Sequence, residues 1–140
     1  MILYIDTSSL AKLYFEEEDS GPIQRQVKSS KLIFSSVIAY PEMCSAFSRR
    51  KREGFLKTSD YKKTLSIFEQ DWEKISKIPV HLELAISAGH LSEKHFLRGM
   101  DAVHLASACL LRDELREAIY FLSSDKKQLQ AASKENLIVP

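Results

Sequence analysis

Cysteine, glycine and proline are scarce in this chain, which has two, four and four of them among 140 residues. Cys44 and Cys109 lie far apart in apolar helical surroundings and form no CxxC pair. This excludes a disulfide framework, argues against zinc and predicts buried, reduced thiols. No apolar stretch is long enough to span a membrane. The opening MILYIDTSSL has an acid at position 6 and no basic leader, so we expect no targeting segment and a cytoplasmic location.

A strong charge of either sign is also missing, because the formal net charge is only +1. The charges nevertheless cluster locally in a basic run at 49–52 and an acidic run at 16–19. Runs of this kind are usually solvated faces. Hydrophobic residues make up 44% of the chain, and no linker or repeat interrupts it. We therefore expect a single folded domain over residues 1–140.

Short apolar segments alternate with helical patterns along the chain. Strands are predicted at 2–5, 31–35, 77–80, 119–122 and 137–139. Helices are predicted from 7, from 20, from 36 or about 40 to 52, and over 58–75, 81–96, 99–113 and the residues after 125. This order predicts an α/β fold of three layers, with a central, mostly parallel sheet and helices on both faces.

Four acids occupy unusual places in this pattern. Asp6 and Asp125 each follow an apolar strand, at the sheet edge where ligands bind in such folds. Asp101 begins the most apolar helix, and Glu42 is the only charge between Lys31 and Arg49. Taken singly, each acid has an ordinary interpretation as a helix cap, a helix-start acid or an exposed position.

Together the four acids indicate a metal site. Carboxylates that converged would repel one another unless a cation neutralised them. Oxygen ligands completed by water suit Mg²⁺ or Mn²⁺ better than zinc. Such an ion polarises a phosphodiester oxygen and acidifies its bound water, so the chemistry indicated is phosphodiester hydrolysis without a covalent intermediate.

Four segments of the chain occur in the order and spacing of a known family. They are IDTSSLAKLYFEE, SSVIAYPEMCSAFSRRKREG, LRGMDAVHLASACLL and FLSSDKKQLQAASKENLIV. The chain resembles PIN-domain ribonucleases over essentially its whole length, and most of all the VapC toxins of type II toxin–antitoxin systems. The resemblance implies a PIN-like fold, a metal-dependent endoribonuclease toxin, a cognate antitoxin, and a homodimer.

The resemblance also assigns roles to residues. It implies that Asp6, Glu42, Asp101 and Asp125 are catalytic, with Asp6 and Asp101 holding the metal most directly. Ser123, Thr7 and Ser8 would orient carboxylates or water. Pro41, directly before Glu42, departs from the family pattern and leaves the role of Glu42 less defined.

Other residues are assigned from spacing. His104 follows Asp101 by one helical turn, yet a metal-activated water needs no histidine base, so we expect packing or hydrogen bonding from it. Arg49 shares a helix face with Glu42, about 10 Å away, where a guanidinium could hold a neighbouring phosphate. The hypothesis is that Arg49, Arg50 and Lys51 steer RNA toward the acids.

Several alternatives remain. A catalytically silent PIN-like module that binds RNA or protein would keep the same pattern. A phosphatase with Asp6 as nucleophile would need an acid where Ser8 stands, a receiver domain would need paired acids and a lysine that are missing, and no G-x-S-x-G motif supports a serine nucleophile. For the homodimer or another partner, we expect an exposed apolar surface at Leu13, Tyr14 and Phe15.

Overall fold

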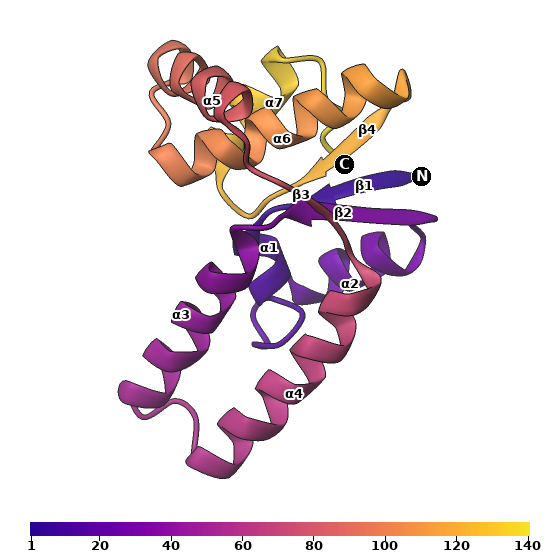
Figure 1. Cartoon of the computed structure of the whole chain (residues 1–140). Coiled ribbons are helices and arrows are strands. Elements are labelled where there is room, and N and C mark those ends of the chain that lie inside the picture. The colour runs from indigo at the N-terminus through magenta and orange to yellow at the C-terminus, as the bar shows by residue number, and fades with distance from the viewer.

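The computed structural model describes all of residues 1–140 and centres on a four-stranded sheet in the order β3-β2-β1-β4 (Figure 1). Every neighbouring pair of strands is parallel. The strands are β1 (Ile2–Ile5), β2 (Leu32–Ser36), β3 (Ser76–Ile78) and β4 (Ile119–Leu122). The helices are α1 (Thr7–Ala11), α2 (Ser20–Lys28), α3 (Ala39–Arg52), α4 (Thr58–Lys74), α5 (Leu82–His95), α6 (Gly99–Leu115) and α7 (Lys126–Lys134).

Helices cover both faces of the sheet, so the predicted three-layer α/β fold is confirmed. In Figure 1, α5, α6 and α7 lie on one side and α1 to α4 on the other. Side chains alternate along β1: Tyr4 joins the core beneath α5–α7, while Leu3 and Ile5 join the opposite core. A parallel strand buried on both faces accounts for the continuous apolar run in the sequence. None of the helices is both long and apolar enough to cross a membrane.

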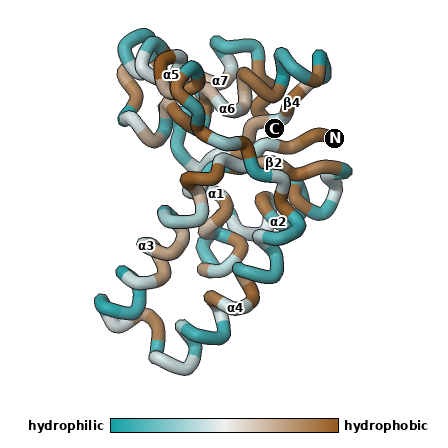
Figure 2. Tube along the Cα trace, in the orientation of Figure 1, coloured by the Kyte–Doolittle hydropathy of each residue, from teal (hydrophilic) through white to brown (hydrophobic).

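The helices α3 and α4 form an arm that extends away from the sheet (Figure 1). Phe47 of α3 and Phe68 of α4 are fully buried between them, with ring centroids 5.6 Å apart. The outer end of the arm is mostly hydrophilic, but a hydrophobic segment lies in the connection between the two helices (Figure 2). This arm carries Glu42 near the sheet and the basic run at its far end.

Two predicted elements differ from the structure. Residues 137–139 form no strand, and only a single bridge joins Ile138 to Tyr120. Pro140 follows directly and has no N–H with which to continue the ladder. The third strand begins at Ser76 and ends at Ile78, earlier than predicted.

The prediction of an exposed surface at Leu13, Tyr14 and Phe15 is wrong. Because α1 ends at Ala11, the following turn folds these residues back onto the core beneath α3 and α4. Phe15 is only 7% exposed, and its ring centroid lies 5.2 Å from that of Phe47. The two cysteines are free thiols as predicted, although both are half-buried rather than fully buried.

Candidate functional site

Two of the four acids, Asp6 and Asp125, stand at the same edge of the sheet because β1 and β4 are neighbours. Ile5 pairs with Leu122, and the Asp6 N–H donates to the Leu122 carbonyl at 3.0 Å. Each acid then caps the helix that follows its strand. Asp6 Oδ1 accepts from the Ser9 N–H at 3.1 Å, and Asp125 Oδ1 accepts from the Lys127 N–H at 2.9 Å. The same parallel edge therefore holds both carboxylates at helix starts.

Hydroxyl groups join these two strand ends. The Ser8 hydroxyl donates to Asp6 Oδ1 at 2.7 Å and accepts from the Ser124 N–H at 3.0 Å. Its oxygen also lies 3.3 Å from the Ser123 hydroxyl, which accepts from the Asp125 N–H at 3.1 Å. Ser8 and Ser123 thus lie between the strand ends that Asp6 and Asp125 follow, and Ser8 contacts the Asp6 carboxylate.

The third acid, Asp101, is in the first turn of α6. Gln128 of α7, which is fully buried, donates from Nε2 to the Asp101 carbonyl oxygen at 2.7 Å and ties the starts of the two helices together. No hydrogen bond or ion pair within the protein engages the Asp101 carboxylate. The role of Gln128 was not predicted from the sequence. Its position three residues after Asp125, about one helical turn away, was the available indication that it lies near the site.

Glu42 reaches the site from the first turn of α3, where its side chain is half-buried. Its Oε1 accepts from the Thr7 hydroxyl at 2.6 Å and lies 2.8 Å from His104 Nε2. Pro41 stands within the same turn, where backbone N–H groups have no partner within the helix. The proline therefore fits the helix and leaves Glu42 facing the site.

His104 is buried and holds the middle of a hydrogen-bonded chain. Its Nδ1 lies 2.8 Å from the Tyr4 hydroxyl, and its Nε2 lies 3.1 Å from the Thr7 hydroxyl as well as close to Glu42. Since Thr7 gives its only hydroxyl proton to Glu42, we assign the imidazole proton to Nε2, which donates to Glu42. The Tyr4 hydroxyl then donates to Nδ1. The expected hydrogen-bonding role of His104 agrees with this geometry.

Tyr4 is the member of this hydrogen-bonded network that the sequence did not predict. It is fully buried in β1, among Ile and Leu residues that need no partner. A buried tyrosine hydroxyl almost always has a hydrogen-bond partner, so the one phenol in an otherwise aliphatic strand was a usable signal.

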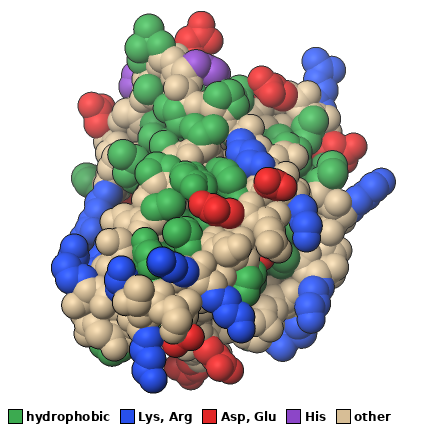
Figure 3. Space-filling model, turned by 60° about the horizontal axis from the view of Figure 1, so that its bottom comes forward, with side chains coloured by type: hydrophobic (Ala, Val, Ile, Leu, Met, Phe, Trp, Pro, Cys, Tyr) green, Lys and Arg blue, Asp and Glu red, His purple; other side chains and the backbone are tan.

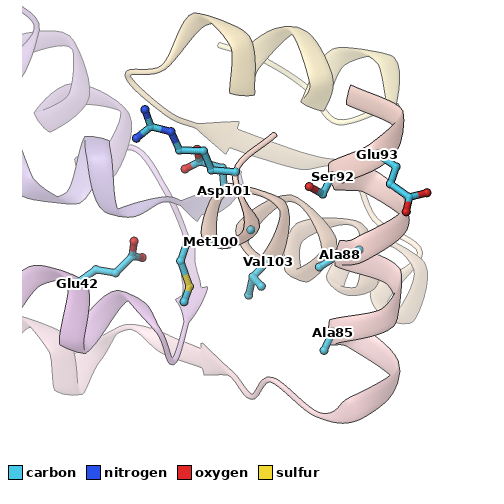
Figure 4. Close-up of a pocket in the computed structure, with 11 residues that line it drawn as sticks. Glu42, Ala85, Ala88, Ser92, Glu93, Met100, Asp101 and Val103 are labelled. Carbon is cyan, nitrogen blue, oxygen red and sulfur yellow. The ribbon is translucent and has the colours of Figure 1, made fainter. Parts of the chain in front are cut away.

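The site opens as a groove of about 680 Å³ between α1, α3 and α6. Its lining includes three of the predicted acids and their neighbours: Asp6, Thr7, Ser8, Glu42, Arg49, Arg98, Met100, Asp101 and His104. A second hollow continues from it toward α5, and Figure 4 shows Glu42 projecting from α3 toward Met100 and Asp101 at the start of α6. Asp125 does not line the groove itself.

Burial is the main cause of the raised pKa values of the two aspartates in the groove. Burial raises the pKa of the Asp6 carboxyl, against the opposing influence of His104. Burial also raises the pKa of Asp101, and the charges of Asp125 and Asp6 add to this. For Glu42, burial acts in the same direction, but hydrogen bonds from His104 and Thr7 outweigh it and lower the pKa. No lysine or arginine pairs with Asp6, Asp101 or Asp125.

The raised pKa values predict how stability depends on pH without metal. An unfolded aspartate titrates near pH 4, whereas the folded pKa values of Asp6 and Asp101 lie higher. Their contribution to stability is therefore complete below that pH and is lost as pH rises through the folded values. In EDTA, Asp101→Asn is expected to raise the melting temperature by a few degrees at pH 7 and hardly at all below pH 4. A variant that melts lower than wild type at pH 7 would contradict this.

The donor set fits a hard divalent cation. Asp6, Glu42 and Asp125 each use one carboxylate oxygen in hydrogen bonds within the protein and leave the other without such a bond, and Asp101 leaves both. No three acidic or histidine side chains converge closely enough to hold an ion by themselves. Mg²⁺ commonly binds through one or two carboxylates and keeps several waters, so a pair such as Asp6 and Asp101 matches that chemistry.

The three predicted RNA-binding residues have different surroundings. Arg49 is exposed, lines the groove and makes no ion pair. Arg50 pairs with Glu17 at 2.8 Å and lies over the Phe15 ring, 4.2 Å from its centroid. Lys51 lies over the ring of Tyr61 at 4.8 Å. Of these three residues, only Arg49 combines an unpaired guanidinium with a place beside the acids.

The fold and the acids define an α/β domain with an acidic groove at the carboxyl edge of its parallel sheet. The model of the PIN domain matches residues 3–134. The chain is 36% identical over 116 residues to the ribonucleases VapC45 and VapC49 of Mycobacterium tuberculosis, covering 80% of this chain and 78% of each relative. The chain belongs to the PIN domain family and is related to the VapC ribonuclease toxins of toxin–antitoxin systems.

Solved structures share the fold at lower identity. A chain of VapBC2 from Rickettsia felis, solved with a DNA fragment from the promoter, has a TM-score of 0.67 at 16% identity, covering 100% of this chain and 98% of that one. VapC20 of Mycobacterium tuberculosis, a toxin that cleaves the sarcin-ricin loop, has a TM-score of 0.65 at 16% identity, with 92% and 94% covered. Identities this low show the shared fold alone.

Proposed function

We propose that this VapC-like protein is a metal-dependent endoribonuclease that hydrolyses RNA phosphodiester bonds in the acidic groove. The observation that carries the proposal is that the carboxylates of Asp6, Glu42 and Asp101 line one groove, with no cationic side chain paired to Asp6 or Asp101. Relationship to the VapC ribonucleases supports the same chemistry. A silent RNA- or protein-binding module of the same fold is the alternative.

The four acidic residues would have different roles in this reaction. Asp6 and Asp101 would hold Mg²⁺ or Mn²⁺ through their unbonded oxygens, and Asp125 would add negative charge beside Asp101. The ion would supply electrostatic stabilisation for the phosphodiester and activation of water. Glu42, fixed at Oε1 by Thr7 and His104, would direct its free Oε2 at water in the groove.

Metal dependence is tested by cleavage of a structured RNA in Mg²⁺, in Mn²⁺ and in EDTA. We expect cleavage only with a divalent ion. The same ions are expected to raise the melting temperature, because they bind the assembled site and not the unfolded chain. RNA binding without cleavage in either metal would favour the silent module, and cleavage that persists in EDTA would contradict the metal site.

Arg49 is proposed to hold a phosphate next to the bond that is cut. Arg49→Ala is expected to weaken RNA binding and to reduce the slope of log affinity against log salt by about one, the loss of a single phosphate contact. Arg25→Ala serves as a matched control, since Arg25 lies on α2 and lines neither hollow beside the acids. If the slope of log affinity against log salt is the same for Arg49→Ala and wild type, Arg49 does not contact a phosphate.

The relationship to VapC toxins supports a cognate antitoxin as partner. A cytoplasmic location, expected from the sequence, belongs to the same proposal. A homodimer is part of the same proposal, although Phe15 is buried and Leu13 and Tyr14 are only partly exposed, so these residues offer no exposed apolar surface for it. Co-expression with the adjacent gene product tests the antitoxin. We expect a complex in which RNA cleavage is suppressed.

A further inference from the structure

The acidic groove does not end at Arg49. A further hollow of about 400 Å³ is lined by Ala11, Phe15, Ala46, Arg49, Arg50, Glu53 and Phe55. Three of these residues, Ala11, Ala46 and Arg49, also line the acidic groove. The two hollows therefore adjoin along one side of α3, and Arg49 is among the residues that line both.

Phe55 forms the far wall of this extension, and its backbone is fixed there. The helix α3 ends in a Schellman motif around Gly54, which has a φ of 83°. The Gly54 N–H donates to the Lys51 carbonyl at 3.1 Å, and the Phe55 N–H donates to the Arg50 carbonyl at 2.9 Å. Gly54 supplies the left-handed conformation that this turn requires.

The Phe55 side chain departs from the usual form of that motif. The residue in its position ordinarily packs against the last turns of the helix. Here Phe55 is 71% exposed. An aromatic ring held on a fixed backbone, open to solvent and facing a groove, meets the requirements of a stacking platform.

One unpaired cation, Arg49, lines the same hollow as the ring, together with Arg50, which pairs with Glu17, and the carboxylate of Glu53. Arg49, Lys51 and Arg52 are exposed in the last turns of α3, and Arg49 makes no ion pair. Figure 3, which brings the lower side of the molecule forward, shows Lys and Arg side chains along the margins of this face. A hollow that combines an unpaired guanidinium with an exposed aromatic ring matches a single-stranded nucleic acid. The guanidinium can contact a phosphate, and the ring can stack on a base.

We propose that the extension is a subsite for single-stranded RNA, in which Arg49 contacts a backbone phosphate and the Phe55 ring stacks on a base beyond the bond that is cut. This inference rests on the proposed ribonuclease function, because it places the substrate of the same groove. Phe55 contributes to substrate selection through an unpaired base, so duplex RNA would bind less well than a loop or a free strand.

The test compares Phe55→Leu with Phe55→Trp. Leucine keeps an apolar side chain but has no ring, whereas tryptophan keeps the stacking surface. The probe is a fluorescent single-stranded RNA oligonucleotide in Mg²⁺, bound to each variant in the cleavage-deficient Asp101→Asn background. We expect Phe55→Leu to weaken binding about 5- to 100-fold and Phe55→Trp to retain it. Phe96→Ala, at a phenylalanine that is 79% exposed and lines none of these hollows, is the matched control.

Each outcome separates this inference from the function on which it rests. If the wild-type protein does not cleave RNA with Mn²⁺, the proposed function fails. If wild type cleaves RNA but Phe55→Leu in the Asp101→Asn background binds the oligonucleotide as tightly as Asp101→Asn alone, the subsite is overturned. A Phe55→Leu variant that loses only self-association or antitoxin binding, with RNA affinity unchanged, would overturn it in favour of a protein contact.

Discussion

Replacing Asp101 with asparagine is expected to lower the rate of RNA cleavage by more than about 100-fold. Loss of a residue that only hydrogen-bonds to a metal ligand costs about 10- to 100-fold in activity, and loss of a direct metal ligand should cost more. The Asp101 carboxylate has no hydrogen bond within the protein, so its charge is free for a cation. Asparagine keeps the size of the side chain and removes the charge. The fold should survive, since burial and the charges of Asp125 and Asp6 already disfavour the ionised form and raise its pKa.

The measurement is the cleavage rate in Mn²⁺ together with thermal unfolding. Asp113→Asn is the matched control, because Asp113 lies near the other end of the same helix, exposed and paired with Arg112. We expect the control to cleave like wild type. Wild-type turnover by Asp101→Asn would refute the assignment, whereas a variant that fails to unfold cooperatively would show a structural role instead.

Replacing His104 with alanine is expected to reduce both stability and cleavage. The side chain is only 2% exposed, and its removal leaves the fully buried Tyr4 hydroxyl without its hydrogen-bond partner. The cavity and the unsatisfied hydroxyl together should cost about 3 kcal/mol of unfolding free energy. Cleavage should fall about 10- to 100-fold, because Glu42 loses the donor that fixes its Oε1.

A double-mutant cycle separates these two effects. If His104 acts through Glu42, adding His104→Ala to Glu42→Gln should lower cleavage no further, even though stability still falls. His104→Gln should recover part of the cleavage, since its amide can donate to Glu42. Independent, additive losses of cleavage in the double variant would show that His104 does not act through Glu42.

The parts of the site that follow from strand order could be predicted from the sequence. Asp6 and Asp125 each end an apolar segment, and the parallel sheet places such ends at one edge. Asp101 was identified from the conflict between a charged residue and an apolar helix. The packing of helices on both sheet faces followed from the alternation of strand and helix patterns.

The rest depends on tertiary contacts that no local pattern specifies. The chain from Tyr4 through His104 to Glu42 joins residues that are 100 and 62 positions apart. An exposed surface was expected at Leu13, Tyr14 and Phe15 because their helix was expected to continue. Instead, α1 ends at Ala11, Phe15 enters the core, and Leu13 and Tyr14 pack against it, partly buried. Arg50 was expected to face RNA, but its guanidinium pairs with Glu17.

The central claim is that Asp6 and Asp101 together bind the divalent ion that cleavage requires. The most direct test is a crystal structure of the protein soaked in Mn²⁺, with the anomalous signal of the metal recorded. The proposal predicts a peak in the groove, in contact with a carboxylate oxygen of Asp6 and one of Asp101. A saturating soak that leaves this position without a peak, or that places Mn²⁺ only elsewhere on the molecule, would contradict it.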